Sequence, residues 1–306
     1  MIRYDHRLLL RSSGFVYFCL AALAQASGET DMAVKVRRAV TAFPASVGIY
    51  AKNLDTGRSF SHRADERVRT ASTIKLPVMI AVFQAVEDGK ARWTDTIALT
   101  EAARVSGSGV IREMSDGLAI PIRDLMRLMI VVSDNTATNL LIDRFGADYV
   151  NEQLDKLAIA NTRCLRKIMG DRNALKEPDG WSQAGLIEEN KKYGIGYSTP
   201  RDMVALLEKI ELGQAVSADS SAEMIRILKR QQYRDGIGRA WRLDVASKSG
   251  ALDALRSDAG IVYTTKGRLA VSVTVDGMKR TDWSPDNPGN KLISEITGHL
   301  LKGLAQ

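Results

Sequence analysis

Strand-forming segments lie near both ends of this 306-residue chain, and a long stretch with helical spacing separates them. The segments 46–51 and 58–60 near the N-terminus, and 259–264 and 269–275 near the C-terminus, are short runs bounded by turn residues, which is typical of strands. Strands from the two ends of the chain are expected to pair antiparallel into one sheet, and this requirement constrains the fold more than any other feature.

Helical periodicity predicts the remaining elements. Residues 31–43 and 290–303 are amphipathic and are expected to cover the sheet. Segment 170–199 is polar, contains glycine and predicts a long loop. The expected fold is α+β, with an α/β part at 30–70 and 240–306 and an inserted all-α part at 71–239. The helices expected in that inserted part span residues 73–88, 121–131, 136–145, 148–157, 200–212 and 219–230.

The first 26 residues have the layout of a secretory signal. Basic residues precede an apolar run at 14–24, and Ala24-Gln25-Ala26 supplies small residues for cleavage. The run is too short to span a bilayer, so no stable membrane anchor is expected. A buried N-terminal helix is the alternative. We therefore expect a mature domain at 27–306, which is secreted or periplasmic after cleavage near Ala26.

Composition excludes several classes of function. Removing residues 1–26 takes away three basic residues and one acidic residue, so the formal charge falls from +7 to +5. No dense basic stripe with interleaved aromatics occurs, so nucleic acid is not an expected partner. Three scattered histidines and a single mature cysteine, Cys164, make no metal-ligand cluster, and no metal or cofactor is expected. We expect a monomer that acts on a small molecule.

A first motif, Ser72-Thr73-Ile74-Lys75, stands at the start of the predicted helix 73–88. Residues i and i+3 share one helical face, so Lys75 can reach the hydroxyl of Ser72. A serine hydroxyl becomes a good nucleophile when a base takes its proton, and a lysine with a lowered pKa can be that base. The alternative is that Ser72 simply caps the helix.

A second motif, Ser133-Asp134-Asn135, follows the predicted helix 121–131. Ser133 could pass a proton between Lys75 and a leaving group. The amide of Asn135 could bind Lys75 or a substrate carbonyl, and Asp134 is expected to cap the next helix. A plain helix cap is the alternative for the whole tripeptide.

A third motif, Lys248-Ser249-Gly250, lies in a possible edge strand at 244–250. There Lys248 would attract a substrate carboxylate and lower the pKa of a neighbouring lysine, and Ser249 could donate to the same carboxylate. Gly250 would let substrate lie against the backbone. The N–H groups of Ala251 and Ser72 could form an oxyanion hole. A solvated lysine before a turn is the alternative.

Together the three motifs, in this order, resemble those of class A β-lactamases and penicillin-binding proteins. The resemblance extends over most of residues 30–303 and includes the run Leu128 to Asn139 and the 61-residue separation of Ser72 from Ser133. It implies a two-part β-lactamase-like fold and a serine acyl-enzyme. Ser72, Lys75 and Ser133 would then be catalytic, and Asn135, Lys248, Ser249, Gly250 and Ala251 would bind substrate.

The sequence departs from class A β-lactamases at the glutamate that activates the deacylating water. Counted without gaps, Met169 falls at that position, and a thioether cannot accept a proton from water. Asp171 and Glu177 are the possible substitutes, but loop structure or solvation is the expected role of each carboxylate. Losing a general base typically slows a step by about 10²–10⁴-fold.

Three functions therefore remain open at the level of sequence. The leading hypothesis is β-lactam hydrolysis through Ser72. A D-alanyl-D-alanine peptidase, or another penicillin-binding hydrolase with slow deacylation, is the second. A β-lactam-binding sensor that stays acylated is the third.

Overall fold

One five-stranded sheet organises the computed structural model, which describes residues 31–169, 177–239 and 244–305. The strand order is β2-β1-β10-β9-β8, and each neighbouring pair is antiparallel. The predicted pairing of the two ends of the chain is confirmed, because β1 pairs with β10 along its whole length. The strands are β1 (Ser46–Asn53), β2 (Ser59–His62), β8 (Asp244–Leu252), β9 (Leu255–Thr264) and β10 (Gly267–Asp276).

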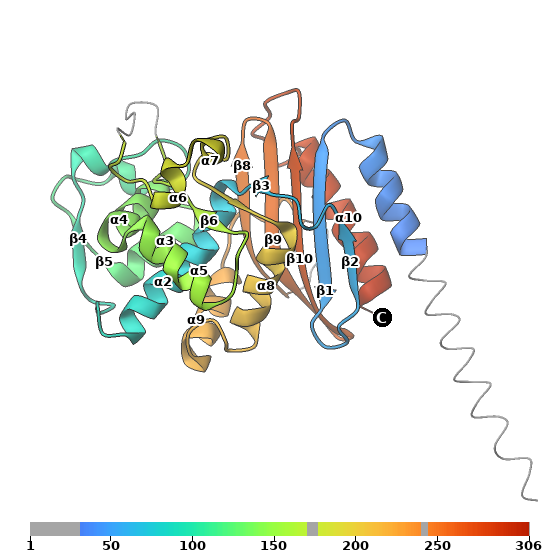
Figure 1. Ribbon diagram of the computed structural model, residues 1–306, viewed down its shortest axis with the longest axis horizontal. Helices are drawn as coiled ribbons and strands as arrows, with labels where there is room; N and C mark the ends of the chain where they lie inside the picture. Colours follow the sequence, from blue (N-terminus) through green and yellow to red (C-terminus); the bar gives the residue numbers. More distant parts are fainter. Residues whose placement is uncertain (1–30, 170–176, 240–243, 306) are drawn as a thin grey trace, which may run out of the picture.

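Each face of this sheet is covered by a separate layer of helices (Figure 1). Successive side chains of a strand point to opposite faces, so the buried side chain of Ile261 joins one apolar core and that of Val262 joins the other. The helix at 31–42 and α10 (Pro288–Leu304) cover the Val262 face, as the sequence predicted. The larger helical part packs on the Ile261 face, with α8 (Pro200–Glu211) against β1 and β10.

The inserted part of the chain is helical in its larger elements, at close to the predicted positions. A 3₁₀ turn, η1 (Ala71–Ile74), leads into α2 (Lys75–Glu87), which is buried along most of its length. Two further short 3₁₀ turns are η2 (Glu101–Ala103) and η3 (Ile111–Glu113). The other long helices are α3 (Ile122–Val131), α4 (Asn135–Phe145), α5 (Ala147–Lys156) and α9 (Ala218–Leu228).

Short strands and helical turns correct the sequence prediction in two places. The inserted part is not purely helical, because it holds one small sheet and two of the three strands of another. Segment 170–199 is not one long loop either: its residues 177–199, the portion that the structure describes, contain α6 (Gln183–Leu186), α7 (Glu188–Lys191) and a strand. The small sheets are β3-β7-β6 (Val68–Arg69, Gly196–Ser198, Arg163–Cys164) and β4-β5 (Thr96–Ala98, Ala119–Pro121).

Two expectations concern residues that the structure leaves undescribed. The predicted signal at 1–26 and the candidate base Asp171 both lie outside the described residues. Among the described helices, none combines the length and the apolar character that crossing a bilayer requires.

Candidate active site

Ser72 lies within η1, where the helical part meets the sheet. The preceding residue, Ala71, has a left-handed φ of 45°, a conformation that non-glycine residues rarely adopt. No side-chain cap is formed at the start of η1 or of α2, so the alternative of Ser72 as a helix cap is not supported. The side chain of Ser72 is half-buried and lines a cavity.

Lys75 begins α2 with its side chain fully buried. Its Nζ donates to the carbonyl oxygen of Ser133 at 2.8 Å and to Asn135 Oδ1 at 2.9 Å, and it lies 3.1 Å from Ser133 Oγ. Burial, reinforced by the positive charge of Lys248, holds the pKa of Lys75 well below its ordinary value. A lysine amine with a lowered pKa within hydrogen-bond reach of a hydroxyl is an arrangement that can move protons.

Ser133 occupies the turn between α3 and α4 in a left-handed conformation, with φ 53°. The side chain of Asp134 stabilises this turn, as it accepts from Ala137 N at 2.8 Å at the start of α4. The predicted cap is therefore confirmed. The same carboxylate accepts from Val110 N and Ile111 N, so it also ties the loop at 105–111 to α4. Strained backbone that the surroundings hold in place is common at functional sites.

Asn135 uses its side-chain amide to join Lys75 to the loop at 105–111. Its Oδ1 accepts from Lys75, and its Nδ2 donates to the carbonyl oxygen of Ser106 at 2.9 Å. Both halves of the amide are thus engaged within the protein. Of the two roles that the sequence left open for this amide, the structure supports binding to Lys75.

Strand β8 is the edge strand of the sheet and runs beside η1, which confirms the predicted strand at 244–250. The approach is closest at Gly250: a Cβ atom there would lie 2.9 Å from both Ser72 N and Thr70 O. Only glycine therefore lets the strand come this near to the backbone of Ser72. Ala251 follows directly and is exposed at the same edge.

Lys248 is buried in the middle of β8, and its Nζ donates to the carbonyl oxygen of Ser249 at 2.8 Å. Burial lowers its pKa to about 7, although the nearby carboxylate of Asp258 opposes this shift. Asp258 is itself buried on β9, and burial raises its pKa to about 6. One of its carboxylate oxygens accepts from Ile237 N at 2.9 Å. Both groups therefore change charge close to neutral pH.

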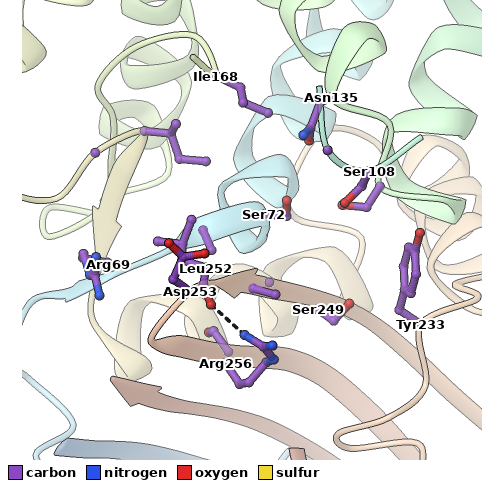
Figure 2. A pocket seen from close by; sticks show the side chains of 18 of the residues that line it. Arg69, Ser72, Ser108, Asn135, Ile168, Tyr233, Ser249, Leu252, Asp253 and Arg256 are labelled. Carbon is purple, nitrogen blue, oxygen red and sulfur yellow. Dashed lines mark hydrogen bonds between the residues drawn. The ribbon is translucent and has the colours of Figure 1, made fainter. Parts of the chain in front are cut away.

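These elements enclose a cavity of about 640 Å³. Figure 2 shows Ser72 at its centre, with Asn135 and Ile168 on one side and Ser249 and Arg256 on the other. Lys75 and Lys248 are buried beneath the wall, while six predicted residues line it. Those six are Ser72, Ser133, Asn135, Ser249, Gly250 and Ala251.

Several residues that line the cavity were not assigned a function from the sequence. They come from single positions in loops, where no motif or periodicity marks them. Arg256, which lies on β9, also lines the cavity and donates to the backbone carbonyls of Leu252 and Leu255. The unpredicted lining residues include Ser108, Arg166, Ile168, Tyr233 and Trp283.

Ile168 and Met169 make part of the cavity wall apolar, in the segment where the sequence indicated the position of the water-activating glutamate. The side-chain amide of Asn139 pairs with both the N–H and the carbonyl of Ile168, which fixes this residue in the wall. Met169 follows, also lines the cavity and is half exposed. Glu177 forms an ion pair with Lys191 at 2.8 Å and is not among the lining residues, so the structure does not support it as a base.

Comparison with known proteins agrees with this arrangement. The β-lactamase enzyme family matches residues 31–304, nearly all of the described chain. The chain belongs to the β-lactamase enzyme family.

Family membership makes the chain a class A-like serine hydrolase. The similar proteins include β-lactamases and the protein PBP-A. The crystal structure of a β-lactamase from Sphaerobacter thermophilus is 34% identical over 89% of this chain and 97% of that one, with a TM-score of 0.76. The structure of PBP-A is 25% identical over 89% of this chain and 94% of that one, with a TM-score of 0.73. A β-lactamase of Bacillus licheniformis is 28% identical over 92% of this chain and 86% of its own. Within the described ranges, no group of His, Cys, Asp and Glu side chains could hold a metal ion.

Proposed function

We propose that this chain is an exported, monomeric serine hydrolase that opens β-lactams through an acyl-enzyme on Ser72. One observation carries the proposal: Ser72 and the strained Ser133 line one cavity beside the edge strand β8, and Ser133 accepts from the buried, pKa-lowered Lys75. Residues 1–26 would act as the export signal, and the mature enzyme would be secreted or periplasmic.

In the proposed acylation, Ser72 Oγ forms a bond to the lactam carbonyl carbon and the lactam C–N bond breaks. The proton of Ser72 moves to Lys75, because a lowered pKa favours the neutral amine that can accept it. Ser133 Oγ, 3.1 Å from Lys75 Nζ, then relays a proton to the ring nitrogen. The N–H groups of Ser72 and Ala251 would hold the oxyanion.

The third motif would bind the carboxylate of the substrate and so position its lactam ring. Ser249 lines the cavity and can donate to the carboxylate of a β-lactam, while Lys248 beneath it supplies positive charge. Because burial lowers the pKa of Lys248 to about 7, this charge is present below neutrality and fades above it. Carboxylate binding should therefore weaken as the pH rises through 7.

The apolar wall favours a second candidate, a penicillin-binding hydrolase such as a D-alanyl-D-alanine peptidase. Ile168 and Met169 both line the cavity, and neither can take a proton from water. An acyl group on Ser72 would then be released slowly, because this described part of the wall offers water no general base. Release rate, rather than acylation, separates this candidate from a fast β-lactamase, and absence of any release would favour the sensor.

Intact-protein mass spectrometry after addition of benzylpenicillin tests the proposal. We expect the mass to increase by one whole penicillin, because ring opening loses no atoms. Ser72→Ala should show no increase, whereas Ser108→Ala, a matched change in the same cavity, should still be acylated. An unmodified wild-type protein that also turns over no β-lactam would refute the proposal.

The wall makes a separate prediction about release. Ile168→Glu should place a carboxylate in the cavity and shorten the lifetime of the acyl-enzyme by at least about tenfold, within the range expected of a general base. Ile187→Glu, at an exposed position that does not line the cavity, is the control and should leave the lifetime unchanged. The decay of the acylated mass measures both, and equal lifetimes would argue against an apolar wall as the cause.

A further inference from the structure

A second hollow continues the catalytic cavity on the side away from Tyr233. It measures about 400 Å³ and shares Arg69 and Tyr193 with the cavity. Figure 2 places Arg69 on the opposite side of Ser72 from Tyr233 and Ser249. A substrate whose carboxylate sits near Ser249 would thus extend its acyl side chain toward Arg69 and into this hollow.

The cations along this path differ in whether they are neutralised. Arg69 forms a two-point ion pair with Asp276, with contacts of 2.9 and 2.5 Å. Arg63 is likewise paired with Glu66. These pairs account for both carboxylates that line the second hollow.

Three other cations on the path have no carboxylate partner within the described residues: Arg166, Arg67 and Lys192. Arg166 lines the catalytic cavity, stacks on Trp181 at 5.3 Å and donates to the carbonyl of Lys167. Arg67 and Lys192 line the second hollow and lie over the rings of Tyr197 and Tyr193, at 4.4 and 5.2 Å from the ring centroids.

Neighbouring cations on the same segments show how unusual this is. Lys167 pairs with Asp143, and Lys191 pairs with Glu177 and Glu188. Arg166 directly precedes Lys167 and is half-buried. Burial lowers its pKa, and no described carboxylate offsets this cost. A desolvated guanidinium at a cavity wall gains most from an anionic ligand that completes its hydrogen bonds.

We infer that Arg166, Arg67 and Lys192 form a cationic subsite for a carboxylate on the acyl side chain of the substrate. The preferred substrate is therefore an acyl compound with two carboxylates, one held near Ser249 and one at this subsite. The inference rests on the proposed function for the identity of the reactive centre, and it adds the chemical class of the side chain.

A matched pair of penicillins tests the inference. One carries a glutaryl side chain on the amine of the penam nucleus, and the other carries the glutaramide of equal length, so the two differ only in the terminal charge. We expect wild-type protein to be acylated about tenfold faster by the anionic probe, as one charge-assisted hydrogen bond provides. The preference should shrink as ionic strength rises.

Variants assign the preference to named side chains. Arg166→Gln, and the double variant Arg67→Gln with Lys192→Gln, should each reduce the preference and leave the rate with the neutral probe unchanged. Arg230→Gln is the control, because it removes an exposed cation that lines neither hollow. Equal rates for the two probes in wild type, or a preference that survives in both variants, would overturn the inference.

A measurement of equilibrium binding tests the subsite independently of the acylation of Ser72. Calorimetry with Ser72→Ala should show tighter binding of the anionic probe, with the same loss in Arg166→Gln on that background. Selective binding without acylation of wild type would contradict the proposed function and leave the subsite standing. Acylation of wild type with no selectivity in either assay would do the reverse.

Discussion

Two lysines and two strained residues determine what Ser72 can do. Lys75 and Lys248 are both buried, and the charge of one opposes protonation of the other. Ala71, at the start of η1, and Ser133, in the turn between α3 and α4, both hold left-handed conformations. The strain and the desolvation cost free energy that the surrounding packing must offset, which is a frequent arrangement where a site is preorganised.

The effect of Lys248 on Lys75 can be measured as a pH dependence. After burial, the charge of Lys248 is the next cause of the lowered pKa of Lys75, so Lys248→Met should raise that pKa. Lys75 acts as a base only when deprotonated, so the acidic limb of the acylation rate should move to higher pH. Stopped-flow acylation across pH measures the limb independently of the overall rate loss. A limb that stays in place or moves to lower pH would contradict the coupling.

At the scale of elements, the site depends on how closely β8 approaches η1. Gly250→Ala adds a Cβ within 2.9 Å of Ser72 N, so strand or turn must shift. Such a displacement of about 1 Å can cost on the order of 100-fold in rate. We expect acylation to slow by at least about tenfold while the circular dichroism spectrum is unchanged.

A second glycine of the same sheet provides the control for this prediction. Gly48→Ala in β1 places its Cβ 3.1 Å from a side-chain atom of Pro200, away from Ser72, and should leave acylation close to wild type. If both variants acylate normally, the close approach at Gly250 is not what positions the site.

The sequence predicted long elements well and short ones poorly, for a physical reason. The helices α3, α4, α5 and α8 show their periodicity over several turns, which tertiary packing then reinforces. The strand expected at 259–264 begins four residues earlier, at Leu255. The sequence did not predict this start, because the first residues of the strand include Arg256 and Asp258. These polar side chains are buried where the strand passes the cavity, and no alternation of polar and apolar residues reveals them.

The candidate site divides in the same way. Ser72, Lys75, Ser133 and Lys248 were predicted because their chemistry repeats in a fixed order of motifs. Arg166, Ile168 and Tyr233 reach the cavity from loops whose paths depend on tertiary contacts, such as the pairing of Asn139 with Ile168. Counting along the sequence placed the missing glutamate at Met169. In the structure, the residue that Asn139 holds by its backbone is the preceding one, Ile168.

At the scale of the whole molecule, one sheet is shared by two apolar cores. The faces of β9 and β10 supply residues to both cores, so the sheet cannot lose one layer of helices without exposing the other side of the same strands. The site lies at the edge of this sheet, which means that the geometry of Ser72 and Lys248 relies on both layers.

A cavity-forming substitution tests this shared architecture. Ile261→Ala, at a fully buried position on the helical side, should lower the free energy of unfolding by about 2–5 kcal/mol. Urea unfolding followed by far-UV circular dichroism and by tryptophan fluorescence should still give one coincident transition. Two separated transitions would show that the helical part unfolds independently of the sheet.

The position of the covalent adduct on the chain tests whether Ser72 is the nucleophile. After labelling with benzylpenicillin, trypsin cleavage following Arg69 and Lys75 releases residues 70–75, which include Ser72. We expect this peptide to carry the added mass and fragmentation to assign it to Ser72 rather than to Thr70 or Thr73. An adduct on any other residue, or a labelled protein whose peptide 70–75 is unmodified, would contradict this expectation.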